Sequence, residues 1–349
     1  MVPRFAILAA CAFAFAAQVR GAQTPIYQLR ALAMYSQTTK CAAWGLNDSG
    51  QIVGSGGRFG PDRIAYPLRW TPSGAVSRVG TLWDYDQASA NAIDNSGNIV
   101  GGVGFSAFYR QANGFMITVP MRVAYDINSR NQVSGFTGTC AGVWHPSGTL
   151  TRLGMLSGYE WAYGRSINDS GQVAGYAAKA STGESRALMW TPAGARVLLP
   201  LPGMESFSSA SDINSSGQIA GSVDWTAVVW EPNLAMRRLS APPGQIMSEA
   251  WGINDSGWVV GCARGSGGRD APVVWTPDSV QIPLPMLAGC DWGVASKINR
   301  FGQIVGHCGS SITYQVYPVT WVIVPEPSSI AVLLCGFGAL GGVVWRRKH

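Results

Sequence analysis

The chain has 349 residues, of which 47% are hydrophobic and only 13% are charged, and it contains 44 glycines and 14 tryptophans. Its formal net charge is +6, but the terminal segments carry most of that excess, so residues between them have a net charge of about +2. This balance excludes a strongly basic nucleic-acid-binding surface. A low charged fraction with many Gly and Trp residues is typical of a secreted all-β protein.

Residues 1–22 have the pattern of a secretory signal peptide. Arg4 precedes an apolar stretch from Phe5 to Ala17, and small residues suited to cleavage follow as far as Ala22. The sequence therefore predicts export. Just after this segment, Ile26 to Leu32 has the pattern of a short strand.

A nine-residue phrase then recurs seven times. It begins with an apolar residue and Asn or Asp, passes through small polar residues to Gly or Asn, and ends in an apolar run that closes with Gly. The copies begin at Leu46, Ile93, Ile127, Ile167, Ile213, Ile253 and Ile298, and the closing glycines are Gly54, Gly101, Gly135, Gly175, Gly221, Gly261 and Gly306. Fixed spacing inside the phrase, with 34 to 47 residues between copies, indicates a repeat array of rigid hairpins joined by loops of variable length.

The middle of each phrase predicts a tight turn between two antiparallel strands. The fifth residue is Gly in six copies and Asn131 in the third, which indicates a backbone position with positive φ. The Asn or Asp at the second position can bond its own backbone two residues on and so begin the turn. Calcium binding by the Asp residues of the three Asn-Asp-Ser-Gly copies is the alternative. Since no copy has the carboxylate spacing of a calcium loop, we favour the turn.

After each hairpin comes an apolar strand that ends in an aromatic residue, followed in most repeats by a turn. This residue is Trp70, Trp144, Trp190, Trp230, Trp275 or Trp321, and Phe108–Tyr109 takes its place in the second repeat. A fourth short apolar stretch follows, at residues 76–82, 150–156, 197–201, 238–239 and 280–284. Four strands in about 42 residues is the period of a β-propeller. We expect the tryptophans to pack between neighbouring repeats.

The chain ends predict how the repeats close. The seventh repeat has only three strands, and the segment from Ile26 to Leu32 has the pattern of the missing fourth. Pairing these ends would remove exposed sheet edges. We therefore predict an all-β, seven-bladed β-propeller over residues 23–323, closed by pairing of its N- and C-terminal strands. An open β-solenoid is the alternative, but it would not need such complementary ends.

The repeats resemble the HAF-repeat extracellular proteins. That pattern joins a Leu-Gly-Thr-Leu strand to Ile-Asn, a Gly turn and Val-Val-Gly, and the segments from Val79 to Gly101 and from Leu153 to Gly175 fit it. The signature His-Ala-Phe is replaced by Ser106-Ala-Phe108 and Arg186-Ala-Leu188, so no role of the family's His carries over. The resemblance covers most of residues 26–323 and implies no established activity.

Residues 324–349 form a second terminal signal. Val324, Pro325, Glu326 and Pro327 precede an apolar run over residues 330–345, predicted to be a hydrophobic helix, and then a basic end, Arg-Arg-Lys-His. A plain membrane anchor is one interpretation, although a span needs about 20 residues. The three-part order resembles the PEP-CTERM sorting signal. This resemblance implies a Gram-negative bacterium that makes exopolysaccharide, transient anchoring in its inner membrane through residues 330–345, and processing by an exosortase before release or surface display.

Five cysteines lie outside the terminal segments, so they cannot all pair internally. Cys290 and Cys308 flank the seventh hairpin, and a disulfide between them is our prediction. The sequence has no Cys-x-x-Cys motif, and only two histidines lie in the mature region, so we expect no metal and no cofactor. No catalytic motif stands out, and we predict that the protein is not an enzyme.

Aromatic residues gather in the loops that lead from one repeat to the next, which a propeller brings to one face. Trp83, Tyr85, Tyr159, Trp161 and Trp292 stand beside carboxylates there, a combination that suits sugar rings. The sequence thus predicts a non-catalytic secreted or surface-displayed protein of the exopolysaccharide or biofilm matrix. A glycan-binding propeller and a propeller enzyme acting on polysaccharide are the alternatives. Capping of the blade ends is the structural alternative for the aromatic loops.

Overall fold

The computed structural model describes residues 25–36, 38–57, 64–80, 87–201, 207–241 and 244–324. All regular elements in these ranges are β-strands. The described ranges contain no helix with the length and apolar character that a membrane span requires. The predicted signal peptide and hydrophobic helix lie outside them. The chain divides into a unit of residues 28–322, which carries the sheets, and a second unit of residues 1–27 and 323–349.

The strands are short and follow one another closely along the chain. They are β1 (Tyr27–Ala31), β2 (Lys40–Leu46), β3 (Ile52–Gly57), β4 (Ala65–Trp70), β5 (Val76–Arg78), β6 (Ala88–Ile93), β7 (Ile99–Val103), β8 (Ser106–Arg110), β9 (Met116–Val119), β10 (Val123–Ile127), β11 (Val133–Phe136), β12 (Ala141–Trp144), β13 (Leu150–Arg152), β14 (Trp161–Ile167), β15 (Val173–Ala178), β16 (Ser185–Trp190), β17 (Arg196–Leu198), β18 (Ser208–Ile213), β19 (Ile219–Val223), β20 (Thr226–Trp230), β21 (Met236–Arg238), β22 (Gln245–Ile253), β23 (Val259–Gly265), β24 (Asp270–Trp275), β25 (Gln281–Pro283), β26 (Trp292–Ile298), β27 (Ile304–Gly309) and β28 (Val316–Ile323).

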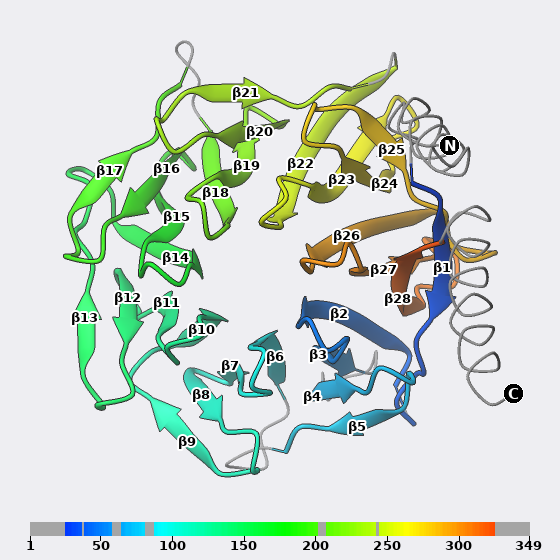
Figure 1. The fold of residues 1–349 in the computed structure, drawn as a ribbon, viewed down its shortest axis with the longest axis horizontal. Coiled ribbons are helices and arrows are strands. Elements are labelled where there is room, and N and C mark those ends of the chain that lie inside the picture. The colour runs from blue at the N-terminus through cyan, green and yellow to red at the C-terminus, as the bar shows by residue number, and fades with distance from the viewer. Residues whose placement is uncertain are drawn as a thin grey trace, which may run out of the picture. The chain divides into compact units, whose positions relative to one another are not determined.

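Each of the second to sixth repeats forms one four-stranded antiparallel sheet. The first and seventh repeats belong to a larger sheet, in which β26–β28 and β2–β5 meet at a parallel bridge between Lys40 and Val316. Within residues 28–322 the first strand of every repeat lies innermost and the last lies at the periphery (Figure 1). The arrangement is propeller-like. Most of the predicted fourth strands are shorter than expected; β5, for example, ends at Arg78 rather than Leu82, whereas β21 begins at Met236, earlier than the predicted 238–239.

The strand ahead of the first repeat pairs with the last repeat, as β1 lies on β28 (Figure 1). Beyond β1, the Leu32 amide donates to the Pro318 carbonyl at 3.0 Å. An equivalent bond joins Leu199 to Ala187, just after the fourth strand of the fourth repeat. The segment before the first repeat therefore occupies the place of a fourth strand beside β26–β28.

Every predicted turn has the expected backbone. The fifth residue of the phrase has positive φ in all seven copies, including Asn131 at 59°. In the first copy, the Gly50 amide donates to the Asn47 carbonyl at 3.1 Å, and the Asn47 side-chain oxygen accepts the Gln51 amide at 2.9 Å. The turn prediction is confirmed.

The closing glycine of each phrase is required by a β-bulge in the innermost strand. Every innermost strand shifts register two residues before the phrase; in β14 the shift lies between Gly164 and Ser166, opposite Gly175 and Ala174. A Cβ on Gly175 would lie 1.8 Å from the Tyr163 carbonyl oxygen, and one on Gly261 would lie 1.9 Å from that of Glu249. No side chain fits so close to the backbone, so the bulge requires glycine at the facing position.

Tryptophan side chains join one repeat to the next. Trp70, Trp190, Trp230, Trp275 and Trp321 are fully buried. Their indole N–H groups donate to carbonyls that follow the preceding fourth strand: Trp190 to Gly154 (2.8 Å), Trp230 to Pro200 (2.9 Å), Trp275 to Ser240 (2.9 Å), Trp321 to Pro285 (2.7 Å) and Trp70 to Ala33 (2.7 Å). The predicted packing between repeats is confirmed, and each buried indole has its polar atom satisfied.

Asparagine side chains link the turns of neighbouring repeats. The donor in each link is the second residue of the phrase, and the acceptor is the backbone carbonyl of the equivalent residue in the next repeat. The links run from Asn47 to Asp94 (3.0 Å), Asn128 to Asn168 (3.0 Å), Asn168 to Asn214 (3.1 Å), Asn214 to Asn254 (3.0 Å), Asn254 to Asn299 (3.1 Å) and Asn299 to Asn47 (3.2 Å). The last of these links connects the seventh repeat to the first.

The second repeat has Asp94 at this position, and an ionised carboxylate cannot donate. Asn98 replaces the usual glutamine four residues later and supplies the missing donor. Its amide donates to Asp94 Oδ2 at 2.7 Å and to Asn131 Oδ1 of the next repeat at 2.8 Å. The link is thus kept by a different pair of side chains.

We predict that Asn214→Ala lowers the free energy of unfolding by about 2–4 kcal/mol, because the Asn254 carbonyl and the Gln218 side chain lose buried partners. Urea unfolding followed by tryptophan fluorescence measures this loss. Asn233→Ala is the matched control, since that exposed asparagine accepts one bond, from the Ala235 amide; its cost should stay within about 0.5 kcal/mol. Equal losses in the two variants would contradict a special role for the linking asparagines.

Candidate functional site

The innermost strands surround a cavity of about 580 Å³. Residues from the first strand of all seven repeats line it. Trp225, in the turn between β19 and β20, and Tyr176 of β15 extend its wall. The cavity therefore depends on the whole array rather than on one repeat.

The bulge in each innermost strand aims one extra side chain at this cavity. The bulged residues are Trp44, Asn91, Tyr125, Arg165, Ser211, Trp251 and Ser296, and all of them line the cavity. Bulges often re-aim side chains beside functional sites. Neighbouring bulged residues can also contact each other: the Arg165 guanidinium lies 4.6 Å from the centre of the Tyr125 ring.

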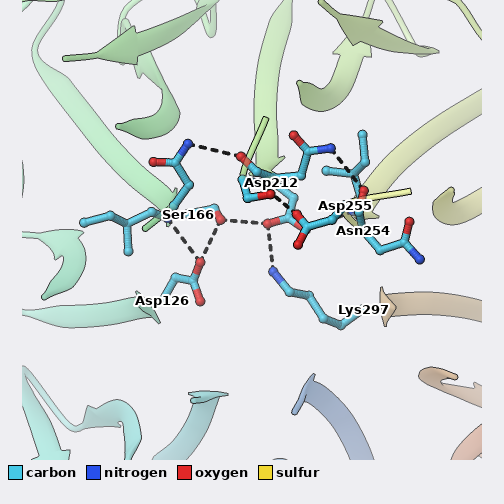
Figure 2. A network of polar contacts seen from close by, with 11 residues as sticks. Asp126, Ser166, Asp212, Asn254, Asp255 and Lys297 are labelled. Atoms are coloured by element: carbon cyan, nitrogen blue, oxygen red, sulfur yellow. Dashed lines mark hydrogen bonds and ion pairs between the residues drawn. The ribbon is translucent and has the colours of Figure 1, made fainter. Parts of the chain in front are cut away.

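Residues that directly follow a bulge form a polar network (Figure 2), of which Asp126, Ser166 and Lys297 line the cavity. Four repeats have a polar residue directly after the bulge: Asp126, Ser166, Asp212 and Lys297. The Ser166 hydroxyl lies 2.7 Å from Asp126 Oδ2 and 2.7 Å from Asp212 Oδ1. The Lys297 ammonium donates to Asp212 Oδ1 at 2.7 Å.

Backbone amides complete the network, as Ile167 donates to Asp126 Oδ2 at 3.1 Å and Ile253 donates to Asp212 Oδ2 at 2.9 Å. The hydroxyl of Ser166 has one hydrogen, so both of its contacts are hydrogen bonds only when one carboxyl group is protonated. Burial raises the pKa of Asp126. Burial opposes the charge on Lys297, but Asp212 and Asp126 raise its pKa above the usual value.

A second cavity of about 220 Å³ adjoins the first on the side of the sixth and seventh repeats. The two share Trp225, Glu249 and Trp251 as lining residues. His307 and Trp292 belong to the wall of the second cavity alone, and the centres of their rings lie 5.8 Å apart in an edge-to-face arrangement. Burial lowers the pKa of His307 to about 4, so its ring is neutral at pH 7.

The described members of the aromatic loop set that the sequence predicts to bind glycan do not share one cavity. Trp83 and Tyr85 lie outside the described residues. The Tyr159 hydroxyl donates to Glu184, and Trp161 is 38% exposed, but neither residue lines either cavity. Trp292 does line the smaller cavity. Their role in glycan binding stays a prediction.

The predicted disulfide partners lie side by side. The Sγ atoms of Cys290 and Cys308 are 2.6 Å apart, and both residues are thiols in this structure. Burial raises the pKa of Cys290 to about 12, and the neighbouring Cys308 adds to the shift. The disulfide stays a prediction. Among the described residues, no cluster of His, Cys, Asp or Glu side chains could hold a metal ion.

The C-terminal segment gives the clearest likeness to known proteins. Residues 324–348 match the family model of the PEP-CTERM protein-sorting motif. The chain carries an exosortase sorting signal. It is therefore a secreted, surface-directed protein with a C-terminal membrane-anchoring signal, as the sequence predicts. Of the motif residues, Val324 ends the described chain, and Pro325, Glu326 and Pro327 lie beyond it.

Solved structures are similar in fold alone. No protein of curated function matches the sequence. A streptogramin B lyase has a TM-score of 0.58 at 9% identity, covering 84% of this chain and 98% of the other. An inactive virginiamycin B lyase from Staphylococcus aureus with quinupristin has a TM-score of 0.61 at 8% identity, covering 86% and 100%. A puromycin hydrolase has a TM-score of 0.55 at 11% identity, covering 82% and 56%. These likenesses support the propeller-like fold and assign no activity.

The bulged residues and the residues after them stand just before the recurring phrase, so the pattern of the phrase does not point to them as lining a cavity. Within the phrase, residue type hardly changes from repeat to repeat, whereas the two preceding positions change freely between aromatic, charged and small residues. Trp251 and Lys297, for example, occupy the two positions in different repeats. Variation at a fixed place in a regular repeat is the signal that could have identified them.

We predict that Lys297→Met lowers the free energy of unfolding by about 3–5 kcal/mol, because it leaves the Asp212 carboxylate buried without its cation. Urea unfolding measures the change, and the double variant Lys297→Met/Asp212→Asn should recover at least about 1 kcal/mol of the summed loss. Arg269→Met is the control, because Arg269 is 52% exposed in its ion pair with Asp291 and should cost at most about 1 kcal/mol. Strict additivity of the two single substitutions would contradict the proposed network.

Proposed function

We propose that this protein is a non-catalytic component of the cell surface or extracellular matrix that binds a matrix exopolysaccharide in its central cavity. The carrying observation is the cavity itself, where Trp44, Tyr125, Trp251 and Trp225 combine with hydroxyl, carboxylate and cationic groups. Aromatic faces stack on the C–H faces of sugar rings, and polar groups bond their hydroxyls. The sorting signal supports a place of action outside the cell.

We also propose that the seven repeats are seven blades of a closed ring. The hydrogen bond from Asn299 to Asn47 supports this, because it repeats between the seventh and first repeats the link found between other neighbours. The bond from Trp70 to Ala33 supports it too, since Ala33 follows β1 as Gly154 follows β13. We infer that the repeats are of the HAF type and that the domain spans residues 23–323.

A non-catalytic role agrees with the state of the polar network. Ser166 is held between two carboxyl groups, and Lys297 is paired with Asp212, so these groups are engaged with one another. The similar solved structures include a lyase and a hydrolase, which makes an enzyme acting on polysaccharide the alternative. Binding without turnover of the polysaccharide distinguishes the two.

Trp225 is the side chain that we expect to contribute most to binding. It has a φ of 61° in the turn after β19, it follows Asp224 at 41°, and it is 51% exposed while lining both cavities. A bulky residue in the left-handed region costs about 1–3 kcal/mol and is retained where function requires it. An exposed indole held over a cavity fits a stacking platform for a sugar ring.

We predict that Trp225→Ala weakens binding of exopolysaccharide purified from the producing bacterium by about tenfold, which corresponds to about 1.4 kcal/mol. Calorimetric titration measures the affinity, and a thermal unfolding curve checks each variant. Trp161→Ala is the matched control, because Trp161 is exposed but lines neither cavity, so its effect should stay within about twofold. A larger loss for Trp161→Ala would favour the loop residues instead, and no binding by the unmodified protein would refute the proposal.

A second prediction concerns sorting. In cells of the Gram-negative host, an exosortase should remove the segment after the Pro325-Glu326-Pro327 motif, because that segment serves as a temporary anchor in the inner membrane. Intact mass of the mature protein from cells with and without the exosortase, combined with fractionation of envelope and medium, tests this. The shortened mass should appear only where the enzyme is present. A retained tail in both strains would reduce this segment to a plain membrane anchor.

A further inference from the structure

The smaller cavity has the composition of a cation site. Three indoles, those of Trp225, Trp251 and Trp292, contribute to a wall that encloses only about 220 Å³. Indole has the strongest cation–π attraction among the aromatic side chains. Because Trp225 and Trp251 also line the central cavity, a group bound here can belong to a ligand that extends into the larger space.

The charges lining this cavity leave one carboxylate unbalanced. Arg264 forms a two-point ion pair with Asp270, with N–O distances of 2.8 and 2.9 Å. Glu249 has no ion-pair partner in the part of the chain that the structure describes, and it accepts the Trp251 indole N–H at 3.0 Å. Cys262 also lines this cavity. Burial raises the pKa of its thiol above the usual value, and the negative charges of Asp270 and Glu249 raise that pKa further. The cavity is thus electronegative.

His307 supplies a polar atom that lacks a partner. Its side chain is 7% exposed, lines the cavity, and lies against the rings of Trp44 and Trp292. Nδ1 has no hydrogen-bond partner among the described residues, and leaving such a group buried and unsatisfied costs about 1–3 kcal/mol. Because the ring is neutral, it does not cancel the negative charge of Glu249.

We propose that the cavity formed by Trp225, Trp251, Trp292, Glu249 and His307 binds a protonated primary amine, presented as the ammonium group of an amino sugar. This inference rests on the proposed glycan-binding function and names the class of glycan: a polymer with free amino groups. An ammonium group has three N–H donors, which suit the Glu249 carboxylate, while the indoles stabilise its charge. An N-acetylated sugar is neutral at the same position and larger.

The test compares three tetrasaccharides that differ at one position of the sugar: the tetramer of glucosamine, the tetramer of N-acetylglucosamine, and cellotetraose. At about pH 6, where primary amines are protonated, the glucosamine tetramer should bind the full-length mature protein at least about tenfold more tightly than the other two. This preference should shrink at high salt, because screening weakens the ionic contribution.

Glu249→Gln is the decisive variant, since it keeps the acceptor for the Trp251 indole and removes only the charge. It should reduce the preference for the amine to within about twofold and leave cellotetraose binding unchanged. Asp278→Asn removes the same charge at an exposed site outside both cavities and should leave the preference intact. Thermal unfolding confirms that each variant is folded.

The outcomes separate this inference from the proposed function. Equal binding of all three tetrasaccharides, or an amine preference unchanged in Glu249→Gln, overturns the amine site and leaves glycan binding in place. Monomeric glucosamine that binds in a Glu249-dependent manner, with no tetrasaccharide binding, supports the amine site and refutes the glycan-binding function. Failure of every probe to bind overturns the amine site, and the titration with purified exopolysaccharide then decides the glycan-binding function.

Discussion

The close approach of two backbones at the bulge is the constraint on which the rest of this structure depends. In each repeat the innermost strand carries one extra residue, and the carbonyl displaced by it leaves no space for a Cβ on the facing strand, as at Gly175. The glycine fixes the register of the hairpin, and the bulge turns a side chain toward the centre. The bulge therefore explains why the closing glycine is the same in every repeat. It also explains why the bulged residue, which faces the cavity, can differ from repeat to repeat.

Contacts between repeats use two layers that serve different purposes. Tryptophans such as Trp190 fill the space between sheets and satisfy their N–H groups on the preceding connection, so burial of large apolar area is combined with a directional bond. Asparagines such as Asn214 join the turns themselves. In the second repeat Asp94 cannot donate, and Asn98 donates to the third repeat instead. The hydrogen bond between these repeats is therefore kept, although its donor stands at another position.

The two cavities gain their chemistry from differences between repeats. Side chains from different repeats meet because all the first strands surround one cavity, so Asp212 of the fifth repeat can bond both Ser166 of the fourth and Lys297 of the seventh. In the central network the Asp212 carboxylate is paired with the Lys297 ammonium. Glu249, which lines both cavities, has no ion-pair partner among the described residues. The chemical differences between the walls of the two cavities thus arise from departures from the repeat.

The sequence by itself determined the repeat, the turn geometry, the role of the buried tryptophans and the sorting signal, because each depends on residues close together in the chain. The positive φ at Asn131 and the burial of Trp321 follow directly from the pattern. The tertiary structure alone decided which side chains meet: the contact between Asp212 and Lys297 joins residues 85 positions apart. No local pattern encodes that distance, because the loops between repeats vary in length while the sheets fix the spacing in space.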